Sequence, residues 1–271
     1  MTMAGHAGRD VRTPLSTARV LDGAIRLADR IGVEKLTIRK LADELGVTPM
    51  AIYHHVASKE EIVNGMVEAV FSEIDLPPVD DDWKTALRRR CVSMHEVLLR
   101  HPWAPPLMES RRSPGPALLH HHDAVLGCLR RGGLPLPWAA HAYAVLDSYV
   151  YGYAMQEASL PFGGDHQIGD LAQAILSAIP ADQYPYLREF TADHALQPGY
   201  HFGDSFEVGL DLLLDGLDTA AATQPDPHYN HPDSQTDRAL ATPTRPRRTN
   251  HAAAGGDPRA CPGRDRPSSR F

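Results

Sequence analysis

The apolar residues of this chain recur at helical spacing from residue 17 to about residue 217, and this periodicity limits the fold more than any other feature of the sequence. In residues 17–31, for example, Val20, Ala24, Leu27 and Ile31 share one face of a helix. No stretch alternates apolar and polar residues as a half-buried strand would. The sequence therefore predicts an all-α fold.

Capping residues and helix breakers divide this pattern into separate helices. Thr37, Thr48, Ser58 and Asp82 are residue types whose side-chain oxygen accepts a hydrogen bond from the first helical turn, so each marks a helix start. Beyond Asp82, the pattern predicts helices near 82–100, 113–131, 135–160 and 168–179, a loop at 180–203, and a last helix capped by Asp204.

Composition excludes several classes of protein. The three cysteines, Cys91, Cys128 and Cys261, are few and widely spaced, which argues against a disulfide framework and for a reducing compartment. No run approaches the roughly 20 apolar residues that span a bilayer, and the N-terminal residues lack the apolar core of a secretory signal. We therefore expect a cytoplasmic protein with no membrane partner.

Charge and composition divide the chain into four regions. Residues 1–60 carry nine Lys/Arg against seven Asp/Glu, whereas residues 61–223 carry ten against 22 and form an acidic body. Residues 224–271 contain eight Pro and eight Arg but few large apolar residues, a composition typical of disorder. A polyanion could therefore bind only through the ends of the chain. The predicted organisation is a flexible basic arm at 1–16, a small domain at 17–62, a larger helical domain at 63–222 and a disordered tail at 223–271.

The segment from Thr37 to Lys59, TIRKLADELGVTPMAIYHHVASK, carries the most specific motif in the chain. Ala42 allows two short helices to cross closely, and Gly46 permits the positive φ that a tight turn between them needs. Ile52 then anchors the second helix against the first. This spacing predicts a helix-turn-helix, whose second helix enters the major groove of DNA.

A generic helical hairpin is the structural alternative, because a small residue four positions before a glycine occurs often by chance. The non-core positions favour DNA recognition instead. Tyr53, His54 and His55 offer phenol and imidazole groups suited to phosphates and base edges, and Lys59 offers an ammonium group. A solvated helix face would more often carry Glu/Lys pairs.

The stretch LTIRKLADELGVTPMAIYHHVASKEEIVNGM resembles the N-terminal domain of TetR-family transcriptional repressors, and its Tyr-His-His-Val and Ser-Lys elements are similar to the tetracycline-repressor branch. The resemblance implies an N-terminal three-helix helix-turn-helix domain followed by a C-terminal helical domain for ligand binding and dimerisation. It also implies a ligand-responsive repressor that binds a palindromic double-stranded DNA operator as a homodimer and is released by a small-molecule effector. The chain departs from the tetracycline-repressor pattern at Pro49-Met50-Ala51, so we expect a different operator.

By position in the motif, the resemblance assigns DNA contacts to both motif helices and to the start of the next helix. Arg9, Arg12 and Arg19 could add minor-groove contacts from the arm, although a disordered tag explains them equally well. The assigned DNA-binding residues are Thr37, Arg39, Lys40, Thr48, Pro49, Met50, Ala51, Tyr53, His54, His55 and Lys59.

The helical body offers candidates for a dimer seam and for an effector pocket. By resemblance, the aromatic-rich helix at 135–160 and the last helix pack with their dimer mates into a four-helix bundle, which suits the spare apolar faces on both. Polar or soft side chains near the middle of the body suit a mostly apolar pocket, although Met and Leu at helical spacing are often plain core. The pocket candidates are Met94, His95, Leu98, Trp103, Leu118, His122, Val125 and Asp147.

Two other classes of function remain as alternatives. One is a metal-dependent or histidine-based helical enzyme built on His95, His101, His122 and Asp147, although no nucleophile elbow, phosphate loop or zinc motif supports it. The consecutive residues 120–122 are all histidines, but on a helix their side chains point about 100° apart and cannot converge on one ion. The other alternative is a helical interaction protein without DNA binding. We expect no enzyme activity, no cofactor and no resident metal.

Overall fold

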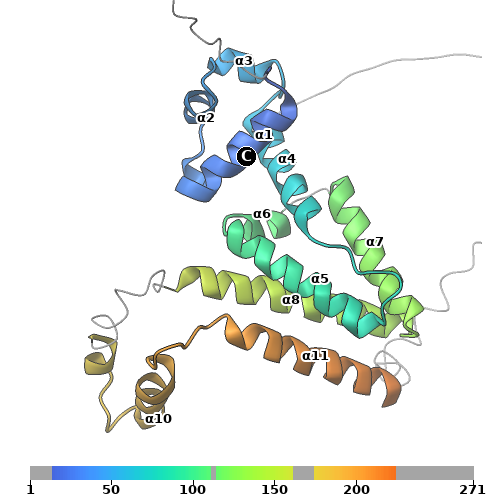
Figure 1. The fold of residues 1–271 in the computed structure, drawn as a ribbon, viewed down its shortest axis with the longest axis vertical. Coiled ribbons are helices and arrows are strands. Elements are labelled where there is room, and N and C mark those ends of the chain that lie inside the picture. Colours follow the sequence, from blue (N-terminus) through green and yellow to red (C-terminus); the bar gives the residue numbers. More distant parts are fainter. Residues whose placement is uncertain (1–13, 111–113, 161–173, 224–271) are drawn as a thin grey trace, which may run out of the picture. The chain divides into compact units, whose positions relative to one another are not determined.

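A computed structural model describes residues 14–110, 114–160 and 174–223, and this part of the chain is helical without a strand (Figure 1). The chain divides into two units, residues 1–228 and 229–271, and every described residue belongs to the first. The described elements are α1 (Thr17–Ile31), η1 (Val33–Lys35), α2 (Ile38–Leu45), α3 (Pro49–Tyr53), α4 (Lys59–Glu73), α5 (Trp83–Arg100), α6 (Ala104–Ser110), α7 (Pro116–Arg131), α8 (Leu136–Ser159), α10 (Pro185–Phe190), η2 (Thr191–Ala195) and α11 (Asp204–Thr223). The prediction of an all-α fold is confirmed.

Four of the five predicted N-caps are confirmed by their hydrogen bonds. The side chains of Thr37, Thr48 and Ser58 each accept from a backbone N–H three residues ahead, and Asp82 accepts from two N–H groups at the start of α5. In a capping box, the carboxylate three residues after the cap accepts from the backbone N–H of the cap residue. Here the Glu61 carboxylate accepts instead from the backbone N–H of Ala57, one residue before Ser58, at 2.6 Å. Local sequence therefore determines where α2, α3, α4 and α5 begin.

The N-terminal helices pack around a small apolar core. Leu41, Ala42 and Ile52 are fully buried between α1, α2 and α3, so the anchoring roles predicted for Ala42 and Ile52 are confirmed. Gly46 ends α2 with φ +66°, the left-handed conformation expected from the sequence. The turn that follows sets the angle at which α3 leaves α2.

We expect Gly46→Ala to lower the free energy of unfolding by about 1 kcal/mol, because an L residue is strained at this φ. A Cβ at this position would meet no atom within 4 Å, so the loss would come from backbone strain rather than from a clash. Urea denaturation measures it. Gly46→Asn is the matched control, since asparagine tolerates the left-handed region better. Equal losses for the two variants would contradict the prediction.

In the body, α5, α8 and α11 lie side by side, and α7 packs against α4, α5 and α8 (Figure 1). Their shared core includes Leu87, Leu98, Val150 and Leu210, all fully buried. α4 contacts α1 of the N-terminal helices and also contacts α6 and α7 of the body. This one helix therefore packs against both the N-terminal helices and the body. None of the described helices is long and apolar enough to cross a bilayer.

Several predicted boundaries are wrong. Residues 180–203, expected as a loop, contain α10 and η2, because Pro185 occupies the first turn of α10, where proline is tolerated. In η2, the Leu196 N–H bonds the Thr191 carbonyl five residues back, a spacing that a search for 3.6-residue periodicity misses. α6 was not expected, α7 begins at Pro116 rather than at 113, and Asp204 is the first residue of α11 rather than its cap.

Other predictions fall on residues that the structure does not describe. These are the arm up to residue 13, the tail from residue 224, Ser113, and the part of the predicted 168–179 helix before residue 174. Residues 174–178 are helical, in agreement with the second half of that prediction.

Candidate nucleic-acid interface and effector site

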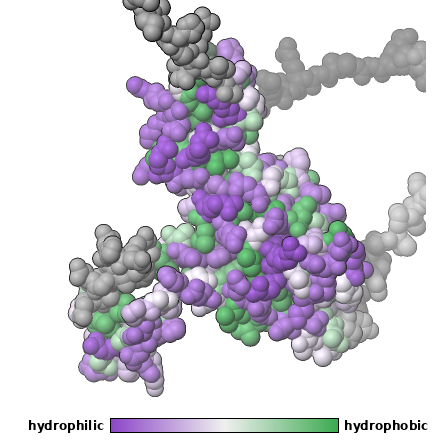
Figure 2. All heavy atoms as spheres, in the orientation of Figure 1, coloured by the Kyte–Doolittle hydropathy of each residue, from purple (hydrophilic) through white to green (hydrophobic). Residues whose placement is uncertain are grey.

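The predicted DNA-binding residues form an exposed surface on α2, α3 and the start of α4. Tyr53 keeps 48% of its surface exposed, and Ala51 and His55 are half-buried. The other residues of this surface are exposed: Thr37, Arg39, Lys40, Thr48, Pro49, Met50, His54 and Lys59. Figure 2 shows mainly hydrophilic residues over this part of the molecule. The outward placement that a DNA interface requires is therefore present.

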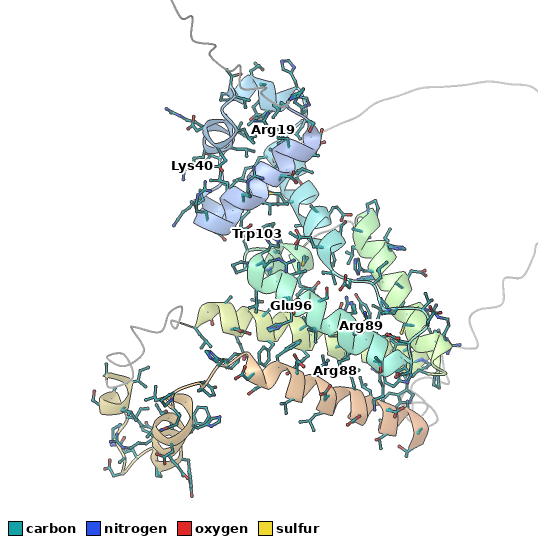
Figure 3. All side chains as sticks on the ribbon, viewed as in Figure 1. Arg19, Lys40, Arg88, Arg89, Glu96 and Trp103 are labelled. Carbon is teal, nitrogen blue, oxygen red and sulfur yellow. The ribbon has the colours of Figure 1, made fainter. Side chains whose placement is uncertain are left out.

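The buried side chain of Ile52 and three hydrogen bonds to backbone carbonyls hold α2 and α3 in place. The Ile52 side chain is fully buried, while the Thr17 hydroxyl donates to the His55 carbonyl at 3.1 Å. Arg19, labelled in Figure 3, donates from Nη2 to the Leu45 carbonyl at 3.3 Å and so braces the end of α2. Lys40 donates from Nζ to the Lys35 carbonyl at 3.1 Å. The exposed side chains of α3 thus project from a braced backbone.

A second polar cluster lies inside the body, where α5, α7 and α8 meet. The Arg90 side chain is only 2% exposed, and its Nη1 donates to Oδ1 of Asp147 at 2.6 Å. Burial and a hydrogen bond to Asp147 raise the pKa of Tyr143, so its phenol stays protonated. His122 packs edge-on against the Tyr143 ring, with centroids 4.8 Å apart. This buried cluster pairs one cation with one carboxylate.

His121, Cys91 and Tyr151 complete this cluster with groups that are uncharged at neutral pH. Burial, together with the positive charge of Arg90, lowers the pKa of His121 to about 4, although a hydrogen bond to the backbone of Phe71 acts in the opposite direction. Burial raises the pKa of the Cys91 thiol to about 11 and also raises the pKa of Tyr151. The charges in the centre of the cluster are therefore those of Arg90 and Asp147.

Comparison with known proteins decides the family. Residues 20–66 match the model of the bacterial regulatory proteins, tetR family, and residues 76–221 match the tetracyclin repressor-like C-terminal domain. The second match alone covers more than half of the chain. The chain belongs to the TetR family of transcriptional regulators.

Individual relatives agree with this assignment. The chain is 30% identical over 223 residues to the HTH-type transcriptional repressor DrrR1 of Streptomyces coeruleorubidus, covering 79% of this chain and 81% of the relative. It is 28% identical over 208 residues to the class A tetracycline repressor from transposon 1721 of Escherichia coli, covering 76% and 91%. Among solved structures, Streptomyces coelicolor ActR in complex with actinorhodin matches with a TM-score of 0.61 and 25% identity, covering 77% of this chain and 99% of ActR.

Membership in the TetR family settles the alternatives. TetR proteins are transcriptional regulators rather than enzymes, and the N-terminal match identifies the helical hairpin as a DNA-binding helix-turn-helix. The enzyme and the simple interaction protein are therefore dropped. In the part of the chain that the structure describes, no three His, Cys, Asp or Glu side chains are grouped as metal ligands.

The structure brings some of the predicted pocket residues together and separates others. His122 and Asp147 meet through Tyr143 in the buried cluster. Met94 and Leu98 are buried one and two turns beyond Arg90 on α5, and on α7 Val125 is buried and Leu118 half-buried. His95 instead lies 2.9 Å from Glu157 and stacks on Phe206 of α11. Trp103 also lies elsewhere, against α1.

Sequence reasoning missed Arg90, His121, Tyr143 and Tyr151. Arg90 is the last of three consecutive arginines, and only its helical spacing to the buried Met94 and Leu98 distinguishes it from Arg88 and Arg89. Arg88 and Arg89 pair with acidic residues nearer the surface, on α11 and in the loop before α5 (Figure 3). That spacing was the available signal for an inward-facing arginine.

Trp103 belongs to a contact that ties α1 to the body. Oδ1 of Asp29 accepts from the Trp103 indole at 2.6 Å and lies 2.8 Å from Nδ1 of His101 (Figure 3). The other ring nitrogen of His101 lies 3.3 Å from the Glu73 carboxylate at the end of α4. Burial raises the pKa of Glu73, but hydrogen bonds from Arg100 and His101 outweigh it and lower the pKa. α1, α4 and α5 are therefore joined by one polar junction.

We expect the stability of the protein to fall as the pH decreases from about 6.5 to about 4. Over this range the unfolded chain protonates His121, whereas the folded protein keeps it neutral because its pKa is lowered to about 4. Urea denaturation at several pH values measures the effect. His121→Phe should flatten the pH dependence relative to His120→Phe, which changes an exposed neighbour. Identical pH profiles for the two variants would show that His121 does not cause the loss.

Proposed function

We propose that this protein is a ligand-responsive repressor that binds a palindromic operator as a homodimer and is released by a small-molecule effector. The observation that carries the proposal is the surface of α3, where Tyr53 and His54 are exposed while Ile52 fixes the helix from inside. A recognition helix needs this combination of an anchored backbone and outward side chains.

Within this surface, the residues divide by the part of DNA that their chemistry suits. The α3 side chains of Met50, Tyr53 and His54 would meet base edges in the major groove, where apolar and hydrogen-bonding groups both discriminate. Arg39, Lys40 and Lys59 would contact phosphates, which position the domain without reading sequence. Thr37 and Thr48, whose oxygens cap helices, can still donate their hydroxyl protons to phosphate.

The homodimer is supported by apolar side chains that α8 and α11 leave exposed. Val208 and Leu212 lie one turn apart on α11, and Val145 and Met155 lie on α8. Gly152 on α8 is also exposed and would let a second helix approach closely. The opposite side of α11 is buried against the same chain through Leu210 and Leu214. The flanking carboxylates Glu207 and Asp215 pair with Arg88 and Lys84. These exposed faces suit a four-helix bundle formed with a second copy.

The effector site is proposed at the buried cluster around Arg90, Asp147 and Tyr143. ActR, a relative, was solved with actinorhodin, which supports a small-molecule effector here as well. The negative charge of Glu109 on α6 acts to raise the pKa of His122 in this cluster, against the effect of burial. Trp103, just before α6, donates a hydrogen bond to Asp29 of α1. An effector that shifts α6 would therefore also shift α1. If the effector binds more tightly to the arrangement in which α1 is displaced, it would weaken operator binding.

Operator binding tests the proposal. We would select operator sequences from a random duplex library with the full-length chain and then compare variants by gel shift. Tyr53→Ala should lose about tenfold or more in affinity for the selected site, because a base-edge contact contributes about 1–3 kcal/mol. Lys59→Ala should weaken all sequences alike and reduce the slope of log K against log salt by about 0.9.

Tyr186→Ala on α10 is the matched control, because it removes an exposed tyrosine outside the proposed DNA surface. Its operator affinity should equal that of the unmodified protein. Failure of the full-length chain to enrich any duplex, or equal effects of Tyr53→Ala and Tyr186→Ala, would refute DNA recognition by α3.

A further inference from the structure

One carboxylate oxygen carries the hydrogen bonds between α1 and the short segment that joins α5 to α6. The Trp103 indole donates to Oδ1 of Asp29 at 2.6 Å, and Nδ1 of His101 lies 2.8 Å from the same oxygen (Figure 3). An indole N–H can only donate and a carboxylate oxygen accepts, so Nδ1 of His101 carries the hydrogen in this contact. Removal of the Asp29 carboxylate would therefore break both hydrogen bonds together.

The two donors are fixed on the side of the body. Trp103 and His101 are each 6% exposed, so water cannot replace a lost acceptor without rearrangement. The other ring nitrogen of His101 lies 3.3 Å from the carboxylate of Glu73, which ends α4 and also accepts from Arg100 at 2.8 Å. The position of Asp29 is thus set by buried groups at the ends of α4 and α5.

The opposite end of α1 holds both helices of the motif. The Thr17 hydroxyl donates to the carbonyl of His55, just after α3, at 3.1 Å, and Arg19 donates to the carbonyl of Leu45, the last residue of α2, at 3.3 Å. Thr17 lies about 18 Å from Asp29 along the axis of α1, at a rise of about 1.5 Å per residue. A tilt of α1 by about 10° at Asp29 would move the Thr17 end, and α3 with it, by about 3 Å.

A displacement of this size matters when a dimer binds two half-sites on one duplex. Successive bases along a strand are about 3.4 Å apart, so a movement of about 3 Å corresponds to about one base pair. A helix-turn-helix dimer requires its half-sites at a fixed separation. Recognition helices held rigidly against the body would reject an operator with an altered separation, whereas helices free to tilt would accept it.

Building on the proposed homodimeric repressor, we propose that Asp29 is a positioning residue for operator recognition. Its hydrogen bonds with His101 and Trp103 fix α1–α3 against the body and thereby set the half-site separation that the dimer accepts. Asp29 acts through α1 on α3 and needs no contact with DNA itself.

Gel shifts with three duplexes test this role in the full-length protein: the selected palindrome, the same palindrome with one base pair inserted at its centre, and a single half-site. The insertion should weaken binding of the unmodified protein about tenfold or more, but that of Asp29→Ala less than about threefold. Half-site affinity should be equal in both proteins, because the surface of α3 is unchanged. Asp22→Ala, an exposed aspartate two turns earlier on α1, is the matched control and should keep the full penalty.

Two further variants separate positioning from a simple loss of stability. Asp29→Asn keeps a carbonyl oxygen that can accept both hydrogen bonds, so it should retain most of the penalty for the inserted base pair. Trp103→Phe keeps an aromatic ring but removes the indole donor, and it should give an intermediate penalty. Urea denaturation of the same variants measures stability separately. A purely structural role would lower the free energy of unfolding and leave the penalty unchanged.

Equal penalties in Asp29→Ala and Asp22→Ala, or a loss of half-site affinity as large as the loss on the palindrome, would overturn the positioning role. The contact itself is measured without DNA by hydrogen–deuterium exchange of the Trp103 indole N–H, whose NMR signal is assigned by its absence in Trp103→Phe. Exchange should be faster in Asp29→Ala than in Asp22→Ala. Unchanged exchange would reject the Asp29 contact, whereas an unmodified protein that binds no duplex would reject the repressor function.

Discussion

Replacing Arg90 with methionine is expected to lower the free energy of unfolding by about 3–5 kcal/mol, because the Asp147 carboxylate would lose its partner inside the body. The Arg90 side chain is 2% exposed and that of Asp147 only 13%, so water cannot replace the missing guanidinium. The hydrogen bond from Tyr143 would remain but cannot neutralise the charge. Chemical denaturation monitored by circular dichroism measures the loss.

Arg89→Met is the matched control one residue earlier on α5. The Arg89 side chain is 65% exposed and pairs with Asp81 at 2.9 Å in a solvated setting, so its removal should cost less than about 1 kcal/mol. The double variant Arg90→Met/Asp147→Leu should recover much of the stability, because it removes both buried charges together. Equal midpoints for Arg90→Met and Arg89→Met would show that the buried pair does not stabilise the fold.

Introducing charge into the exposed face of α11 is expected to separate the proposed homodimer. In Val208→Glu/Leu212→Glu, two apolar side chains that would be buried against a second copy become carboxylates. Leu212 is 70% exposed in the single chain, so the monomer itself should keep its fold and its thermal stability. Light scattering should then report a monomer for the variant and a dimer for the unmodified protein.

Loss of the dimer should lower operator affinity by about a hundredfold or more, because two linked heads bind two half-sites with a high effective concentration. Leu187→Glu, which changes an exposed leucine on α10, is the control and should leave both mass and affinity unchanged. A Val208→Glu/Leu212→Glu protein that remains dimeric, or that binds the operator normally as a monomer, would contradict the proposed seam.

Much of the N-terminal domain could be predicted from local sequence. Thr37, Thr48 and Ser58 mark helix starts because capping depends on atoms within one turn, and Gly46 marks the turn because few other residues adopt its φ. The exposed surface of α3 follows from the same local pattern once Ile52 is recognised as the buried position. Short-range interactions are readable from a single sequence since the residues involved are neighbours.

The buried cluster and the junction at Asp29 could not be predicted in this way. Asp29 and Trp103 are 74 residues apart, and Arg90 and Asp147 are 57 residues apart. The sequence by itself determined most of the helices, four of the five predicted caps and the motif that identifies the family, because these depend on spacing within a few turns. Only the tertiary structure decided which arginine enters the body, which histidine loses its proton and which tryptophan holds α1, because burial and pairing arise only when distant helices pack together.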